Sequence, residues 1–203
     1  QALTQNTNWI NVKASPYSAV GDGVTDDTAA VDAAITAASA GQTVFFPSGE
    51  YNLASWTAAG EDYAKKLHLA GNATLTGTVS LAFLQLSDEI TCEGLTFKEW
   101  DTVFEFDALT TTKNEFRFDK LTFDGCDDCF SWLTPSVSGL ISRISITDCV
   151  AKDLNRFFVE LAGAFDSFSC INTEVDGAYN QAIRLGTNTE ADHYIWNEAR
   201  VIG

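Results

Sequence analysis

Four aspartates recur along the chain at a nearly constant interval. Asp101, Asp127 and Asp153 are evenly spaced, and Asp176 follows after a slightly shorter interval. If each interval is one coil of a repeating fold, their carboxyl groups line one edge of the molecule. Hydrolysis of a glycosidic bond needs two carboxyl groups about 5–9.5 Å apart, one protonated and one ionised. The alternative is that each aspartate forms a turn between two strands by hydrogen bonding to nearby backbone.

A second group of reactive side chains follows the last of these aspartates. The segment "DGAYNQAIR" carries Asp176, Tyr179 and Arg184, and His193 comes shortly after it. A polysaccharide lyase needs a base to remove the proton next to a uronate carboxylate, and a cation to neutralise that carboxylate. Tyr179 and Arg184 are of these two types, although a solvated turn with a surface arginine is the alternative. The candidate catalytic residues are Asp127, Asp153, Asp176, Tyr179 and Arg184.

Three cysteines look like metal ligands at first. Cys126 and Cys129 form a Cys-x-x-Cys pair, and Cys149 follows about one interval later. A zinc site needs four ligands, and beyond these three only Cys170 and the distant His193 could complete it. Because Cys126 and Cys149 align one coil apart, we expect stacked buried thiols, with a coil-to-coil disulfide as the alternative. We expect no cofactor, and calcium is the one ion left open.

Large aromatic residues recur with the same interval. Phe104 and Phe130 are spaced like Asp101 and Asp127, and Phe157 lies near the next equivalent position. Such aromatic ladders are expected in the core, whereas an exposed aromatic ring would stack on a sugar. Both positions stay open for the tryptophans among the strand-like segments, which are Trp100, Trp132 and Trp196.

The elements that must position these residues begin with a helix. The segment "VGDGVTDDTAAVDAAITAASAG" is alanine-rich and carries one apolar stripe, made of Val31, Ala34, Ile35 and Ala38. Thr25 is expected to be the N-cap, with Asp26 and Asp27 in the first turn and Gly41 as the C-terminal stop. The glycines before it then form a tight turn. A calcium loop is disfavoured because it would need more oxygen ligands and a distal glutamate.

Short strand-like segments fill the rest of the chain. From Thr43 onward, β-branched and aromatic segments alternate with a few polar residues, and no second long helix interrupts them. The segment "LTFKEWDTVFEF" from Leu95 aligns with "LTFDGCDDCFSW" from Leu121, a shift equal to the spacing of Asp101 and Asp127. This period, with several strands in each repeat, is typical of a β-solenoid whose coils bury apolar side chains against one another.

The N-terminal segment resembles a known superfamily. From Asn11 to Leu53, "NVKASPYSAVGDGVTDDTAAVDAAITAASAGQTVFFPSGEYNL" is similar to the N-terminal signature of pectate-lyase-like, right-handed parallel β-helix proteins. It fits the branch that contains bacteriophage tailspikes, secreted polysaccharide lyases and hydrolases, and alginate epimerases. The pattern is Gly-Asp-Gly-x-x-Asp-Asp-Thr, a helix, a hydrophobic strand and Pro-x-Gly-x-Tyr. The residues that fit it are Gly21, Asp22, Gly23, Asp26, Asp27, Thr28, Pro47, Gly49 and Tyr51.

The resemblance implies an all-β fold, a right-handed parallel β-helix (solenoid) with an N-terminal capping α-helix. We expect one domain over residues 1–203, with an N-terminal arm and capping helix over 1–42. The β-helix coils are expected over 43–203 and beyond the chain end. The sequence lacks the Gly-His-Gly and Arg-x-Lys motifs of the hydrolase branch and the Asp-Pro-His-Glu motif of the epimerase branch. No catalytic set is therefore carried over from the resemblance.

The charge of the chain excludes two classes of partner. It has 28 acidic and 12 basic residues, a formal net charge of −16, so it is not expected to bind nucleic acid or an anionic membrane. No apolar run approaches the roughly 20 residues of a membrane span, and no signal peptide is visible. Since the chain starts with Gln and contains no Met, we expect its numbering to start inside a longer or processed product.

These observations and the resemblance predict a protein that engages polysaccharide. We expect the β-helical segment of a phage tailspike or tail-fibre protein that binds host surface polysaccharide, with depolymerisation left open. This setting implies a virion-tail location, a homotrimer and contacts with other phage tail proteins. The alternatives are a secreted bacterial polysaccharide lyase or glycoside hydrolase acting on extracellular polysaccharide, and a purely structural virion stalk.

Overall fold

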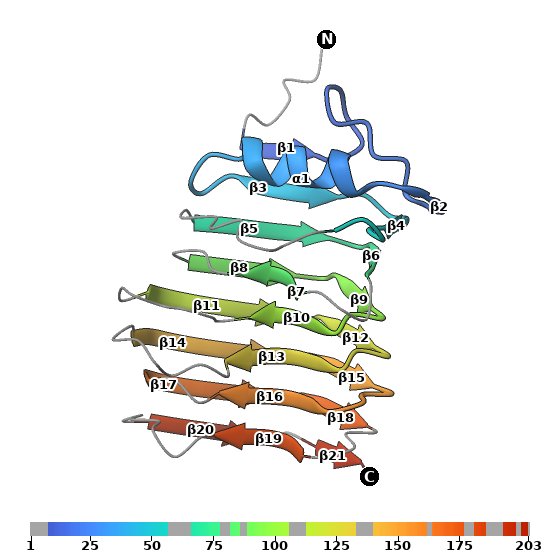
Figure 1. The fold of residues 1–203 in the computed structure, drawn as a ribbon. Helices are drawn as coiled ribbons and strands as arrows, with labels where there is room; N and C mark the ends of the chain where they lie inside the picture. Colours follow the sequence, from blue (N-terminus) through green and yellow to red (C-terminus); the bar gives the residue numbers. More distant parts are fainter. Residues whose placement is uncertain are drawn as a thin grey trace.

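The chain folds as a right-handed parallel β-helix, which confirms the predicted fold class (Figure 1). The computed structural model describes residues 8–56, 66–77, 82–85, 89–105, 113–132, 140–161, 164–176, 181–185, 193–197 and 200–202. Parallel strands from successive coils pair side by side into three sheets that run along the stack. Within the described residues, no helix is long and apolar enough to cross a membrane.

The three sheets are named here A, B and C. Sheet A contains β1 (Trp9–Asn11), β3 (Thr43–Phe46), β5 (Lys66–Gly71), β8 (Glu89–Glu93), β11 (Lys113–Asp119), β14 (Leu140–Thr147), β17 (Ala164–Ile171) and β20 (His193–Asn197). Sheet B contains β2 (Asp22–Asp26), β4 (Glu50–Asn52), β6 (Thr74–Thr76), β9 (Thr96–Lys98), β12 (Thr122–Asp124), β15 (Val150–Lys152), β18 (Glu174–Asp176) and β21 (Arg200–Ile202). Sheet C contains β7 (Ala82–Gln85), β10 (Thr102–Glu105), β13 (Asp128–Trp132), β16 (Phe157–Leu161) and β19 (Gln181–Leu185). Because β1 and β2 pair with β3 and β4, the sheets begin before residue 43.

The alternation of side chains along each strand decides which residues face the core. In β11, Phe116 and Phe118 are buried, whereas Glu115 and Arg117 lie on the outer face. Burying one such phenylalanine stabilises the fold by about 1.5–3 kcal/mol. The outer positions are therefore free to carry polar side chains without loss of core packing.

Aromatic rings form the centre of the stack. Phe104 and Phe130 are stacked with ring centroids 5.4 Å apart, which confirms their predicted alignment. The next buried ring is Phe158, which meets Phe130 edge-on at 5.5 Å. The register pairs Phe130 with Val159 and Asp128 with Phe157, so Phe157 lies near the equivalent position and not at it. Trp100 is a core residue, and its indole N–H donates to the Leu75 carbonyl at 2.9 Å. Trp132 lies on β13 and Trp196 on β20, and their side chains are not among those described.

Four successive corners between sheets A and B have the same length. Two residues separate β8 from β9, β11 from β12, β14 from β15 and β17 from β18. The first of the two has a positive φ angle in every case, and these residues are Gly94, Lys120, Asp148 and Asn172. The second is buried in every case, and these residues are Leu95, Leu121, Cys149 and Thr173. One left-handed residue thus turns the chain, and the next fills the core behind the turn.

Helix α1 (Thr28–Ala37) lies at the N-terminal end of the stack (Figure 1). The predicted apolar stripe is buried and belongs to the core cluster: Val31, Ala34, Ile35 and Ala38. The helix ends at Ala37, with an extended Ala38 as its C-cap. Gly41 is therefore not the residue that stops the helix; it belongs to a turn closed by a hydrogen bond from the Gln42 N–H to the Ser39 carbonyl at 3.0 Å.

The start of the helix differs from the prediction. The N-cap residue is Asp27, not Thr25, and no acidic residue lies in the first turn. The Asp27 side chain is buried and accepts hydrogen bonds from the N–H groups of Val20 (2.6 Å) and Gly21 (2.9 Å). Asp27 therefore holds the preceding turn closed. Burial, together with the nearby charge of Asp27, raises the pKa of Tyr51 to about 12.

Candidate functional site

The strand register places only the first two predicted aspartates in line. Asp127 lies one coil below Asp101, as the pairing of Thr102 with Asp128 requires. In the next coil Asp128 pairs with Phe157, so the position in line with Asp127 belongs to Arg156. The predicted continuation of this line through Asp153 and Asp176 is therefore wrong.

The remaining predicted residues lie on other parts of the coils. Asp153 is exposed and has a φ of 53°, so it turns the chain after β15, as the turn alternative expects. Asp176 is exposed at the end of β18 and aligns with Lys152 of β15. Tyr179 lies outside the described residues. Arg184 lies on β19, where its backbone pairs with Glu160, and its side chain is not among those described.

Asp127 belongs to an ion cluster that links three coils. The Arg156 Nη2 atom lies 3.0 Å from Asp101 Oδ1 and 2.8 Å from Asp128 Oδ2, and its Nε lies 3.9 Å from Asp127 Oδ2. The Asn155 amide also donates to Asp127 at 2.7 Å. Burial raises the pKa of Asp101, and the charge of Arg156 opposes that rise. One guanidinium thus holds three carboxylates in place, which favours a structural role for this cluster.

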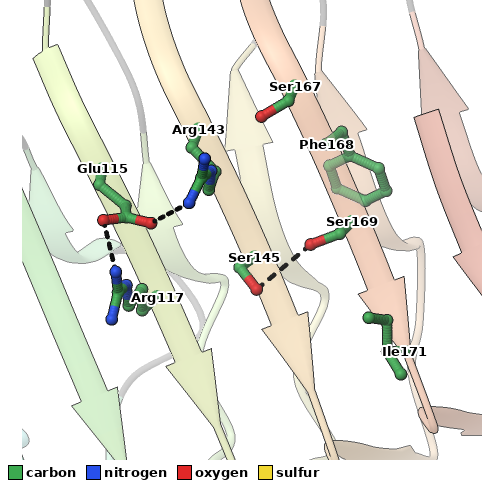
Figure 2. Close-up of a pocket in the computed structure, with 8 residues that line it drawn as sticks. All are labelled: Glu115, Arg117, Arg143, Ser145, Ser167, Phe168, Ser169 and Ile171. Atoms are coloured by element: carbon green, nitrogen blue, oxygen red, sulfur yellow. Dashed lines mark hydrogen bonds and ion pairs between the residues drawn. The ribbon is translucent and has the colours of Figure 1, made fainter. Parts of the chain in front are cut away.

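A separate groove of about 570 Å³ lies on the outer face of sheet A, across β11, β14 and β17 (Figure 2). Glu115 bridges two arginines in it: its Oε2 lies 2.8 Å from Arg117 Nη2 and its Oε1 lies 3.1 Å from Arg143 Nη1. Serine hydroxyls extend the polar floor, and Ser169 donates to the Ser145 hydroxyl at 3.2 Å. The polar lining is made of Glu115, Arg117, Arg143, Ser145, Ser167 and Ser169.

The sequence places these groups together through register alone. In "KNEFRFD", "LISRISIT" and "AFDSFSCI", apolar residues that face the core alternate with residues that share the outer face. Pairing then aligns Glu115 with Arg143 and Arg143 with Ser167. It also aligns Arg117 with Ser145 and Ser145 with Ser169.

The described lining carries two positive charges and one negative charge, and the charge of Glu89 on the neighbouring strand β8 also acts on Arg117. Hydrogen bonding to Arg117, and the nearby charges of both arginines, lower the pKa of Glu115. Both arginine side chains are 60% exposed, whereas Glu115 is 23% exposed. Glu115 therefore orients the two guanidinium groups and leaves their outer edges open to an anion.

The groove is built to bind rather than to transfer protons. Its arginines can pair with carboxylates, and its serines can exchange hydrogen bonds with sugar hydroxyls. Among the described lining residues Glu115 is the one acid, and it is engaged by both arginines. This groove was not predicted, because acids at coil spacing were taken as the signal of a site. The available signal was the alternation of Arg and Ser with buried residues along three consecutive long strands.

The cysteines are buried and free: Cys92, Cys126, Cys129, Cys149 and Cys170. The buried thiols were predicted, but the alignment of Cys126 with Cys149 is wrong, because the pairing of Thr122 with Val150 places Cys149 opposite Leu121. Burial raises the pKa of Cys126 to about 11 and that of Cys149 to about 12. Over the described ranges, no three His, Cys, Asp or Glu side chains are grouped to hold a metal ion. Calcium binding stays a prediction.

The chain is similar to a pectate-lyase-like family and to two mannuronan C5-epimerases. Residues 9–88 match the family described as rhamnogalacturonase A/epimerase, pectate lyase-like. The chain is 48% identical over 156 residues to the mannuronan C5-epimerase AlgE6 of Azotobacter vinelandii, covering 72% of this chain and 17% of that protein. It is 58% identical over 45 residues to the mannuronan C5-epimerase AlgE1 of the same organism, covering 21% of this chain and 3% of that protein. The chain thus spans less than a fifth of either relative, and no solved structure matches it.

Proposed function

We propose that this chain, a pectate-lyase-like parallel β-helix, binds an acidic polysaccharide on the outer face of sheet A, as part of a protein that acts on that polysaccharide. The observation that carries the proposal is the bridge Arg117–Glu115–Arg143 beside the serine hydroxyls. A guanidinium presents paired N–H donors that match a carboxylate, and the neighbouring hydroxyls match a sugar.

The substrate class follows from this chemistry and from the relatives. Mannuronan, which the names of both relatives contain, is a polymer of uronate residues with one carboxylate on each sugar. The two arginines come from adjacent strands, and strands lie about 4.7–4.9 Å apart. A uronate polymer can therefore place its carboxylates against one or both guanidinium groups while its hydroxyls face the serines.

The proposed reaction begins with removal of the proton next to a uronate carboxylate. That step is shared by C5-epimerisation and by lyase elimination, and both need a cation at the carboxylate and a base at the proton. Tyr179 as the base and Arg184 as the neutralising cation stay our proposal for these roles, with Arg184 on β19 of sheet C and thus apart from the groove on sheet A. Hydrolysis by the predicted aspartate pair is less supported, because the register separates Asp153 and Asp176 from Asp127.

Binding to oligomers of mannuronate tests the proposal directly. Arg143→Ala should weaken binding about ten- to a hundredfold, because a charge-assisted hydrogen bond contributes roughly 1.5–3 kcal/mol. The matched control is Lys152→Ala, which removes an exposed cation on sheet B that is paired with Asp124 at 2.9 Å. Titration calorimetry at low and high salt is the measurement. Equal affinities for wild type and Arg143→Ala would refute binding at this groove.

The products of the same incubation separate the possible reactions. Epimerisation changes the sugar configuration seen by nuclear magnetic resonance, whereas elimination creates an unsaturated sugar that absorbs in the ultraviolet. Tyr179→Phe should abolish either reaction and leave the binding affinity of the wild-type groove unchanged. Full turnover by Tyr179→Phe would exclude this residue as the base.

A phage tailspike is an alternative protein in which the outer face of sheet A could bind polysaccharide. A tailspike would present the groove to host surface polysaccharide from a virion tail, and the secreted setting would present it to extracellular polysaccharide. Neither the tailspike role nor the homotrimer that it implies has support from the relatives, whose names are those of epimerases. The polysaccharide-binding proposal does not depend on this choice.

A further inference from the structure

Two aromatic rings lie on the outer face of sheet A, at its N-terminal end. Trp9 of β1 and Phe45 of β3 have ring centroids 5.0 Å apart and planes inclined by 34°. Trp9 is 49% exposed, although indole is the largest apolar side chain and is usually well covered. The two rings form an exposed aromatic surface, named here the shelf, that lies outside the hydrophobic core. Trp9 was not among the tryptophans expected as possible stacking surfaces for a sugar.

A notch continues from this shelf along the corner between sheets A and B. The groove has a volume of about 440 Å³, and beyond the two rings its lining includes Asn72, Glu93 and Lys120. Two glycines keep the notch open. A Cβ atom on Gly94 would lie 2.5 Å from the Gly71 carbonyl oxygen, and one on Gly71 would overlap the Phe46 carbonyl. Lys120 occupies the corner position one coil below Gly94, where it closes the notch with a cation.

The notch lies close to the groove proposed above to bind the polysaccharide, although the described linings of the two share no residue. Strand β11 supplies Arg117 to that groove, and Lys120 follows directly after its last residue. Three residues of extended chain span about 10 Å. Phe45 and Lys120 are separated by three strand steps, from β3 through β5 and β8 to β11, or about 14 Å. One oligosaccharide can therefore reach from the arginines to the aromatic shelf.

We infer that the shelf of Trp9 and Phe45 is a stacking subsite for a pyranose ring of the polysaccharide bound at Arg117 and Arg143. This inference rests on the proposed function for the identity of the ligand. A pyranose has an apolar face of C–H groups that packs on an indole, and its edge carries hydroxyls. In the notch Asn72 can bond such hydroxyls, and Lys120, which lies 2.9 Å from Asp119, keeps further N–H donors for a sugar hydroxyl or carboxylate. The aromatic shelf beside polar side chains, with Glu93 and Lys120 of opposite charge, fits a sugar ring better than an apolar peptide.

The test compares short and long oligomers, because a short one occupies the arginine groove alone. Trp9→Ala should weaken the binding of long mannuronate oligomers about tenfold and leave disaccharide binding unchanged. Trp9→Tyr should keep most of the affinity, because it restores an aromatic face. The control is Val24→Ala, which removes an exposed apolar side chain of β2 away from the notch. Calorimetry with mannuronate oligomers and with neutral mannose oligomers of equal length is the measurement.

The outcomes separate this inference from the proposed function. Loss of affinity in Arg143→Ala without loss in Trp9→Ala for long oligomers overturns the stacking subsite and keeps the proposed function. Binding of long mannuronate oligomers that depends on Trp9 and not on Arg143 supports a stacking site and overturns the uronate groove. If the wild-type protein binds neither kind of oligomer, both proposals are wrong.

Discussion

Two ion pairs of similar length show how burial sets the importance of a single residue. Arg156 lies 2.8 Å from Asp128, which is 1% exposed, and Lys152 lies 2.9 Å from Asp124, which is 30% exposed. A buried carboxylate that loses its cation keeps the cost of leaving water, whereas an exposed one is solvated again. The two pairs have similar lengths, but Arg156 also contacts Asp101 and Asp127, so its loss removes more than one ion pair.

Arg156→Ala should lower the free energy of unfolding by about 2 kcal/mol. The loss is moderate because Arg156 is about half exposed, so water can partly solvate the carboxylates that it leaves. Lys152→Ala should lower it by about 0.2–1 kcal/mol, the usual range for an exposed pair. Urea unfolding followed by circular dichroism measures both. Similar losses in the two variants would mean that Asp128 finds another partner when Arg156 is removed.

At the scale of single residues, the sequence predicted which residue types recur but not which side chains contact one another. The recurrence of Asp101 and Asp127 was visible, and their alignment is confirmed. The residue that follows them in line is Arg156, and nothing local in the sequence marks it as the partner of carboxylates from earlier coils. The side chains of Arg117 and Arg143 meet through Glu115 only because of the register between two long strands.

Helix α1 shows which features of an element can be predicted. Its apolar stripe follows from helical periodicity and is buried as expected. Its start was predicted wrongly because capping rules consider hydrogen bonds within the first turn. Asp27 instead bonds to Val20 and Gly21, in the turn that precedes β2. A backbone turn that lies outside the helix therefore decides where the helix begins.

Ile35→Asp should make the N-terminal end of the stack unfold and the protein aggregate, because an unpaired carboxylate would enter a fully buried site. Ala33→Asp is the matched control, since Ala33 is exposed on the same helix. Solubility and the melting temperature of both variants are the measurements. A soluble Ile35→Asp variant with an unchanged melting temperature would show that α1 does not seal the first coil.

At the scale of the whole molecule, the four corners compared above have the same length, whereas the number of residues in each coil varies. In sheet B, Thr96 pairs with Thr122, Thr122 with Val150 and Val150 with Glu174, so the second step along the chain is longer than the first and the third is shorter. The solenoid could be predicted because the average period is clear. A fixed interval predicts the alignment of residues correctly for one coil only. The predicted alignments of the aspartates and of the cysteines are therefore wrong in the following coil.

The assembly prediction belongs to this scale as well. A tailspike is expected to be a homotrimer, whereas a secreted enzyme of this superfamily can act as a single chain. Light scattering of the full-length protein should give three times the chain mass if the tailspike interpretation is correct. A monomer at all concentrations would contradict that interpretation and leave the polysaccharide-binding groove on sheet A unaffected.

Parallel pairing between consecutive coils also has a consequence for biosynthesis. Each sheet orders its described strands as the chain does, and α1 lies at the end that leaves the ribosome first. The earliest segment can therefore fold into a seed whose open edge receives each later coil as it is translated. Growth in this direction follows the order of synthesis, so no coil has to wait for a distant part of the chain to pair.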